Sequence, residues 1–329
     1  MTTSHTLKLL IGLAAFGIGC SGAPDIQTGP SMILEGDRSP APSASSSEEL
    51  SSSDDEEEED GDQYERQETI SDSTANAECD GEMIAGDAVD RMIRLTEVGN
   101  DESIYTTYDR IDGIASIFEA CGDPWGLFPT TYRHITRRII QAIDGREIEG
   151  REWGEKIVLD FAGRYFANLN AVLTGGEPSY AWEHYYYLAD RSDVSRTRAV
   201  VVAMVAHLTL DLPHALVAVD STEDDKNDYF VLGELMIEIV PDFIEDLRYY
   251  YDTDAEDILN GFFMGRWVDG AFGESTTITL SYQTIRTKAW NNRWLLEQWW
   301  GKWAADSEIY SAFWAIDGVL ASLDSANTI

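Results

Sequence analysis

The chain has 329 residues, of which 43% are hydrophobic and 11% aromatic, and its formal net charge is −37. Residues 81–329 carry 42 acidic and 20 basic side chains and are numerous enough to form one large hydrophobic core. A surface this acidic repels phosphate backbones and anionic lipid, so we expect no nucleic-acid partner. The acidity fits a cationic partner or, more simply, a well-solvated surface.

Residues 1–20 resemble a bacterial export signal of the lipoprotein type. Their apolar run, from residue 9 to residue 18, is too short to span a bilayer as a permanent helix. Because the Gly-Cys-Ser motif at 19–21 resembles the end of a lipoprotein signal, we predict a lipid on Cys20. This lipid would anchor the exported protein to a membrane of the bacterial cell envelope. Gly17 stands where such signals usually have Leu, so cleavage of an ordinary signal near Ala23 is the alternative.

Residues 21–78 are rich in Ser, Pro and Gly and contain the acidic run DDEEEED. Such a segment cannot bury enough apolar surface to offset its ordering entropy, so we predict a disordered tether. The two cysteines after Cys20 are Cys79 and Cys121, an even number that favours one disulfide in an exported protein. Neither belongs to a C-x-x-C pattern, so a zinc site built of cysteines is not expected.

Most of the chain after residue 79 has apolar residues three and four positions apart, as on the buried face of a helix. This spacing predicts helices over residues 132–144, 157–172, 199–219, 228–240 (resuming after Pro241), 253–263, 281–303 and 309–323. Ser192 or Asp193 is expected to cap the third of these, and Thr253 to begin a capping box for the fifth. Residues 265–273 are predicted as loop and 276–278 as a short strand. We predict a single all-α, multi-helix domain over residues 79–329.

The helix over residues 199–219 is apolar on every side except at four positions, which are His207, Thr209, Asp211 and His214. A helix that is apolar all round is normally buried. The three ionisable residues are spaced i, i+4 and i+7 and so fall on one helical face. Inside an apolar helix such groups are costly unless they are paired or bind something. Pro213 cannot donate to the carbonyl of Thr209 and is expected to kink the helix.

We therefore predict His207, Asp211 and His214 as candidate catalytic residues, with His214 the weakest because of the kink. Imidazole and carboxylate one turn apart can share a proton or a divalent metal ion such as zinc. For a metal site, His207 and Asp211 would need a further ligand, and the candidates are His184, Asp225 and Asp228. The alternative is a buried hydrogen-bonded pair that fixes helix packing.

Two other groups of side chains are interpreted more simply. His184 lies among aromatic residues, so a packed, hydrogen-bonded histidine is the expected role. His134 is flanked by arginines and is expected on a solvated helix face. One set of tryptophans could line a ligand pocket, but its helical spacing favours the core: Trp290, Trp294, Trp299, Trp300 and Trp303.

The segment AHLTLDLPHALV, residues 206–217, contains His207, Asp211 and Pro213 of the central helix. It resembles A-H-I-N-x-D-L-P-x-A-L-V, the signature of the domain-of-unknown-function family 5995, with Leu208 and Thr209 in place of Ile and Asn. The resemblance extends over residues 108–322. It implies no activity, cofactor or partner, because none is established for the family.

Weaker similarities to the same family flank this signature. They are GRYFANLNAVL at 163–173 with Trp182 downstream, the pair Asp228-Tyr229, and IRTKAW at 285–290. Asp225 stands where the family has a histidine before its Asp-Tyr pair. The Ala-Arg pair that the family has before its Ala-Trp is missing from IRTKAW.

Two functions remain open from the sequence. The first is a membrane-anchored hydrolase that uses the His-Asp pair, with or without one metal ion to activate water. The second is a non-catalytic helical binding domain for an apolar ligand or a protein partner. Ionisable groups converging on a cavity would favour the hydrolase, and a dry aromatic pocket away from His207 would favour the binding domain.

Overall fold

The computed structural model of the protein describes residues 79–99, 102–264 and 282–329. All of them belong to one compact unit, residues 64–329. The predicted export signal, the lipid on Cys20 and the acidic tether lie outside the described residues. The predicted loop at 265–273 and strand at 276–278 lie outside them as well.

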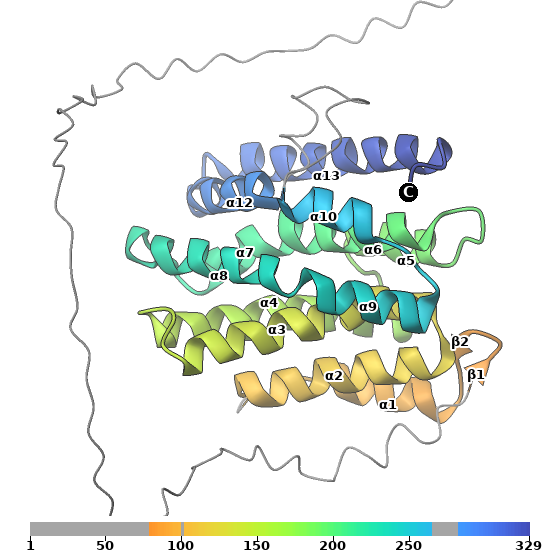
Figure 1. The fold of residues 1–329 in the computed structure, drawn as a ribbon. Coiled ribbons are helices and arrows are strands. Elements are labelled where there is room, and N and C mark those ends of the chain that lie inside the picture. The colour runs from red at the N-terminus through yellow and green to blue at the C-terminus, as the bar shows by residue number, and fades with distance from the viewer. Residues whose placement is uncertain (1–78, 100–101, 265–281) are drawn as a thin grey trace, which may run out of the picture. The chain divides into compact units, whose positions relative to one another are not determined.

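The described residues form a small antiparallel hairpin followed by α-helices, which confirms the predicted all-α fold (Figure 1). The strands are β1 (Cys79–Asp80) and β2 (Met83–Ile84). The helices are α1 (Asp87–Thr96), α2 (Ile104–Cys121), α3 (Leu127–Asp144), α4 (Arg151–Leu173), α5 (Tyr180–Ala189), α6 (Arg196–Ala206), α7 (Leu212–Ala218), α8 (Lys226–Glu238), α9 (Val240–Tyr251), α10 (Glu256–Met264), α12 (Tyr282–Glu297) and α13 (Lys302–Ser325). Three short helical turns join some of them, η1 (Pro124–Gly126), η2 (His207–Asp211) and η3 (Glu223–Asp225).

The apolar helix at the centre of the sequence is also the centre of the core. Helix α6 contacts α3, α5 and α13, and its continuation α7 contacts α4 and α12. In α6, the eight consecutive residues from Ala199 to Ala206 are apolar and buried, and Thr197 before them is buried as well. Within the described ranges, the helix Arg196–Ala218 is long and apolar enough to cross a membrane by length and composition. Because 83% of its most apolar window is buried inside the protein, core packing accounts for that composition.

Three predicted helix boundaries are wrong. Thr253 does not begin a capping box, because its hydroxyl donates to the carbonyl oxygen of Tyr251 and α10 begins only at Glu256. The cap of α6 is Ser195, whose hydroxyl accepts a hydrogen bond of 3.1 Å from the backbone N–H of Arg198, and not Ser192 or Asp193. The helix predicted over residues 281–303 is two elements, because α12 ends at Glu297 and α13 begins at residue 302. Helical spacing alone predicted one continuous helix there, since the aromatic residues repeat across the turn.

The chain accommodates Pro213 by widening one turn of the central helix. In η2, a π-helical turn, the N–H of Leu212 donates to the carbonyl oxygen of His207, five residues earlier. Pro213 then occupies the first turn of α7, where a proline is best tolerated. A π-turn in place of a regular turn changes which side chains share a face, and it is often found at functional sites.

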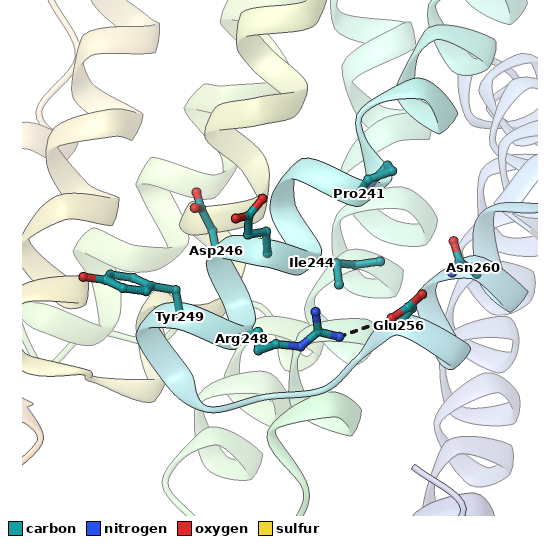
Figure 2. A pocket seen from close by; sticks show the side chains of 8 residues that line it. Pro241, Ile244, Asp246, Arg248, Tyr249, Glu256 and Asn260 are labelled. Atoms are coloured by element: carbon teal, nitrogen blue, oxygen red, sulfur yellow. Dashed lines mark hydrogen bonds and ion pairs between the residues drawn. The ribbon is translucent and has the colours of Figure 1, made fainter.

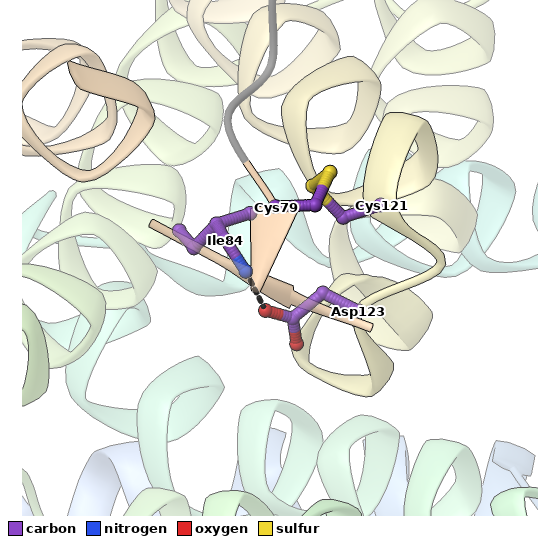
Figure 3. Close-up of a disulfide and its surroundings, with 4 residues drawn as sticks. All are labelled: Cys79, Ile84, Cys121 and Asp123. Carbon is purple, nitrogen blue, oxygen red and sulfur yellow. Dashed lines mark hydrogen bonds between the residues drawn. A yellow bond between two sulfur atoms is a disulfide. The ribbon is translucent and has the colours of Figure 1, made fainter. Parts of the chain in front are cut away.

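A disulfide ties the start of the described chain to the end of α2. Cys79 and Cys121, the pair that the cysteine count favoured, have their Cα atoms 5.6 Å apart (Figure 3). Beside them the carboxylate of Asp123 accepts hydrogen bonds from the backbone N–H groups of Ile84, at 2.9 Å, and Trp125, at 3.0 Å. Burial raises the pKa of Asp123 to about 6, against the opposing effect of these two bonds. The hairpin, the disulfide and η1 thus meet around one buried carboxyl group.

Candidate functional site

The structure brings His207 and Asp211 together at the two ends of the π-turn. Nδ1 of His207 lies 2.9 Å from Oδ2 of Asp211, and the indole Nε1–H of Trp182 donates to the same oxygen at 2.8 Å. Trp182, from α5, can only donate, so the carboxylate is the acceptor and Nδ1 of the imidazole carries the shared proton. His207 and Asp211 are only 3% and 4% exposed. The three side chains form a polar network inside the core.

Aromatic rings surround the imidazole of His207. It stacks on Phe161 of α4, with ring centroids 3.5 Å apart and planes 10° from parallel. The rings of Phe128, Tyr132 and Trp182 meet it edge-on. Burial lowers the pKa of His207, and the bond to Asp211 opposes this only in part. The neutral imidazole keeps a free lone pair on Nε2, which is buried and has no hydrogen-bond partner among the described residues.

His214 does not belong to this network. Its Nδ1 hydrogen-bonds the carbonyl oxygen of Leu210 at 2.8 Å, and its Nε2 lies 3.9 Å from Oδ1 of Asp306 on α13. Its side chain is 31% exposed. The extra residue in the π-turn shifts the register of everything after it, so His214 leaves the face that the i, i+4, i+7 spacing predicted.

The three further metal ligands proposed from sequence have other partners. Nε2 of His184 pairs with Oδ2 of Asp317 at 2.9 Å, and Arg198 holds the other oxygen of that carboxylate. The hydrogen bonds to His184 and Arg198 hold the pKa of Asp317 below its usual value, although burial, the largest single effect, would raise it. His184 is therefore a packed, hydrogen-bonded histidine, as predicted.

The other two proposed ligands, Asp225 and Asp228, accept hydrogen bonds from backbone N–H groups. Asp225 accepts the N–H of Thr222 at 2.7 Å and caps η3, while Asp228 accepts the N–H of Gly150 at 2.7 Å at the start of α4. Over residues 79–99, 102–264 and 282–329, no group of three or more His, Cys, Asp or Glu side chains is placed to hold a metal ion. The metal-ligand set predicted from sequence is therefore not assembled.

The prediction that His134 lies on a solvated helix face is wrong. It is 8% exposed rather than solvated, and its Nε2 lies 2.7 Å from Oδ2 of Asp246, which Arg133 also contacts. The reason is that α9 packs across α3 and brings Asp246 over it. Hydrogen bonds from these two residues hold the pKa of Asp246 below its usual value, although burial acts the other way.

A cavity of about 570 Å³ opens beside Asp246, between α9 and α10 (Figure 2). Polar and charged side chains are most of the described residues that line it, and the one cation among these residues, Arg248, is already paired with Asp254 at 2.9 Å and Glu256 at 3.2 Å. Because Arg248 is paired with Glu256, and Asp246 with Arg133 and His134, most charged groups of the lining already have partners, and the cavity gives no sign of a specific ligand.

A second cavity, of about 40 Å³, lies beside the aromatic cluster. Phe161 and Tyr132 separate it from His207, which does not line it, and apolar side chains of α3, α4, α7 and α8 form most of its wall. Among the described residues that line it, one is charged, Arg286 in the first turns of α12. The sequence did not single out this residue.

Arg286 is 3% exposed, and its guanidinium lies against the backbone of α8 at Gly233. A Cβ atom on Gly233 would overlap the guanidinium, so glycine is required there for the arginine to enter. Nη2 donates to the carbonyl oxygen of Tyr229, and the guanidinium carbon lies 4.1 Å from the centroid of the Tyr229 ring. Nη1 is buried without a hydrogen-bond partner in the described part of the chain.

The tryptophans of α12 and α13 divide into two groups. Trp290 is 3% exposed and belongs to the core, as helical spacing predicted. Four others are at least half exposed, contrary to that prediction: Trp294, Trp299, Trp300 and Trp303. They surround the turn between the two helices, which the sequence pattern did not reveal.

Comparison with known proteins gives a family and nothing further. No curated protein and no solved structure matches the chain. The sequence model of the family of unknown function DUF5995 matches residues 104–315, well over half of the chain. That range contains Trp182, the His207–Asp211 turn and Arg286. The chain therefore belongs to the family of unknown function DUF5995.

Proposed function

We propose that the helical domain is a non-catalytic binding domain for a small molecule with an acidic group, which Arg286 holds in the 40 Å³ cavity. The observation that carries this proposal is the unpartnered Nη1 of a 97% buried guanidinium on an apolar cavity wall. A buried charge without a partner costs several kcal/mol. Stacking on Tyr229 and one carbonyl bond offset only part of that cost, whereas an anion would supply the missing acceptor.

The cavity limits the ligand to a small acid. A water occupies roughly 10–15 Å³ of such a volume, so the space admits about three groups of that size. A guanidinium presents two parallel N–H donors to a carboxylate. The apolar wall beside it, with Trp153 and Ile157 of α4, favours a short hydrocarbon body. Formate and acetate are therefore suitable probes, propionate tests the size limit, and chloride is the smallest anion.

The test is anion-dependent thermal stability of the full chain. Binding to the folded state raises the melting temperature with anion concentration. We expect carboxylates to do this for the wild type, less for Arg286→Lys, and not for Arg286→Met. Arg293→Met is the matched control, because Arg293 is also buried, stacks on Trp290 and has one unpartnered nitrogen among the described residues, Nε, but does not line the 40 Å³ cavity. An equal shift in Arg286→Met and wild type, or no shift with any of the four anions, contradicts the proposal.

One observation favours a second candidate, a hydrolase. A histidine whose Nδ1 is held by a carboxylate, with Nε2 free and neutral, has the arrangement of a general base. The burial of His207 and its absence from the described lining of the 570 Å³ and 40 Å³ cavities weigh against this function. Turnover of p-nitrophenyl acetate that His207→Ala abolishes without unfolding the protein would support it. Equal rates in both proteins would eliminate it.

We further propose that the protein is exported and anchored to a membrane of the cell envelope through Cys20, with residues 21–78 as the link. The Cys79–Cys121 disulfide supports export, because such bonds persist in oxidising compartments. The binding domain would then act outside the cytoplasm.

A further inference from the structure

The turn between α12 and α13 exposes an unusual amount of aromatic surface. Residues 294–303, which we name the tryptophan turn, contain four tryptophans with exposed fractions of 51% (Trp294), 92% (Trp299), 56% (Trp300) and 80% (Trp303). Scattered apolar side chains are normal on a protein surface, but large contiguous patches mark interaction sites. The turn forms one end of the α12–α13 pair, at the left of Figure 1.

The tryptophan turn is held in a defined shape. The N–H of Gln298 donates to the carbonyl of Leu295 at 3.1 Å, and the N–H of Gly301 to that of Gln298 at 2.9 Å. A Cβ atom on Gly301 would lie 2.7 Å from the carbonyl oxygen of Leu295, so the close approach needs glycine. Below the turn, Leu296, Ala305 and Ile309 form a small apolar cluster. The exposed rings are thus presented by an ordered backbone, and their exposure is not the fraying of a helix end.

The geometry points to a lipid surface as the partner. None of the four tryptophans is among the described residues that line the 570 Å³ cavity, the 40 Å³ cavity or a third cavity of about 250 Å³ between α12 and α13. The rings protrude and do not line a groove that a peptide could fill. Tryptophan favours the headgroup level of a bilayer, where its apolar ring and its N–H are both accommodated. A protruding turn with several such rings can enter this soft layer without a shape-matched partner.

The net charge of the tryptophan turn indicates which kind of lipid it would bind. The tryptophan turn contains one acid, Glu297, and one base, Lys302, so it is neutral within a chain of net charge −37. Lys302 is further paired with Asp306 at 2.8 Å. An acidic protein is repelled by anionic lipid, whereas a neutral aromatic tip meets no such barrier at zwitterionic lipid. We propose that the tryptophan turn inserts into the headgroup region of a zwitterionic bilayer.

The experiment is sedimentation with phosphatidylcholine vesicles. Every version is the full chain with Cys20→Ser, so that no lipid on residue 20 contributes. The test variant adds Trp299→Ser with Trp303→Ser, and the matched control adds Tyr249→Ser, an aromatic residue 79% exposed on α9. Because the changed side chains are exposed, their melting temperatures should match that of the parent. The partition coefficient should fall at least tenfold for the double variant and stay unchanged for the control.

Two further measurements test whether the tryptophan turn itself enters the bilayer. Tryptophan fluorescence of the parent should shift to shorter wavelength on adding vesicles, and anionic lipid in the vesicles should weaken binding. No vesicle binding by the parent, or equal binding by the double variant, overturns the proposal. Concentration-dependent self-association without vesicles that the double variant abolishes also overturns it, since the turn would then bind a second copy of the protein.

Discussion

Replacing Asp211 by alanine should destabilise the domain by about 4 kcal/mol. The change leaves two buried donors, Nδ1 of His207 and Nε1 of Trp182, without their common acceptor. Each unsatisfied buried donor costs about 1–3 kcal/mol, so the two together cost about 2–6 kcal/mol. For a domain of this size the loss lowers the melting temperature by about 8–16 °C.

Two further variants make this prediction specific. Both donors bond the same oxygen, Oδ2, so Asp211→Asn can keep both hydrogen bonds through its amide oxygen and should lose less than half as much. The control is Asp160→Ala, which breaks a pair of the same i, i+4 spacing with Arg164 at the surface of α4. That pair is worth about 0.5 kcal/mol.

The assay is thermal and urea unfolding of the three variants and wild type, followed by circular dichroism. The reasoning fails if Asp211→Ala unfolds at the same temperature as Asp160→Ala. It also fails if Asp211→Asn is as unstable as Asp211→Ala, because the negative charge and not the shared acceptor would then hold the network.

The remaining predictions concern the N-terminal half. Replacing both Cys79 and Cys121 by serine should cost about 4 kcal/mol, since the disulfide closes a separation of 42 residues, and wild type under reducing conditions should lose as much. Asp123, with a pKa of about 6 when folded and 3.8 as its ordinary value, binds its proton more tightly in the folded state. Its contribution to the unfolding free energy should therefore grow as pH falls from 7 to 4, and Asp123→Asn should flatten this part of the pH profile. Cys20→Ser should move the protein from the membrane fraction to the soluble fraction, and a wild-type protein found only in the soluble fraction would disprove the lipid anchor.

The sequence was enough to locate the core helix and the His207–Asp211 pair, because both depend on local spacing. It did not reveal the π-turn, since a hydrogen bond that shifts by one residue leaves the apolar pattern unchanged, and His214 was misplaced for that reason. The partners of His184 and Asp228 lie 133 and 78 residues away along the chain. No local pattern contains such information.

The burial of Arg286 could not be predicted from the local sequence either. A single arginine in a helix is normally solvated, and nothing near it in the sequence contradicts that interpretation. Its burial depends on a missing side chain at Gly233, on a helix more than 50 positions earlier. Burial of His134 likewise depends on how α9 crosses α3. Arg286 and His134 thus take their positions from distant neighbours, which no local pattern in the sequence predicts.

The disulfide also decides where a mechanical pull would act. Tension that arrives from the N-terminal side reaches Cys79 and passes through the sulfur–sulfur bond directly to Cys121. Residues 80–120, which include β2, α1 and nearly all of α2, form a closed loop that stays slack. Stretching therefore begins at Gly122 and η1, in the interior of the helical packing. A domain held by its N-terminus could thus be dragged or sheared without its first helices being peeled away.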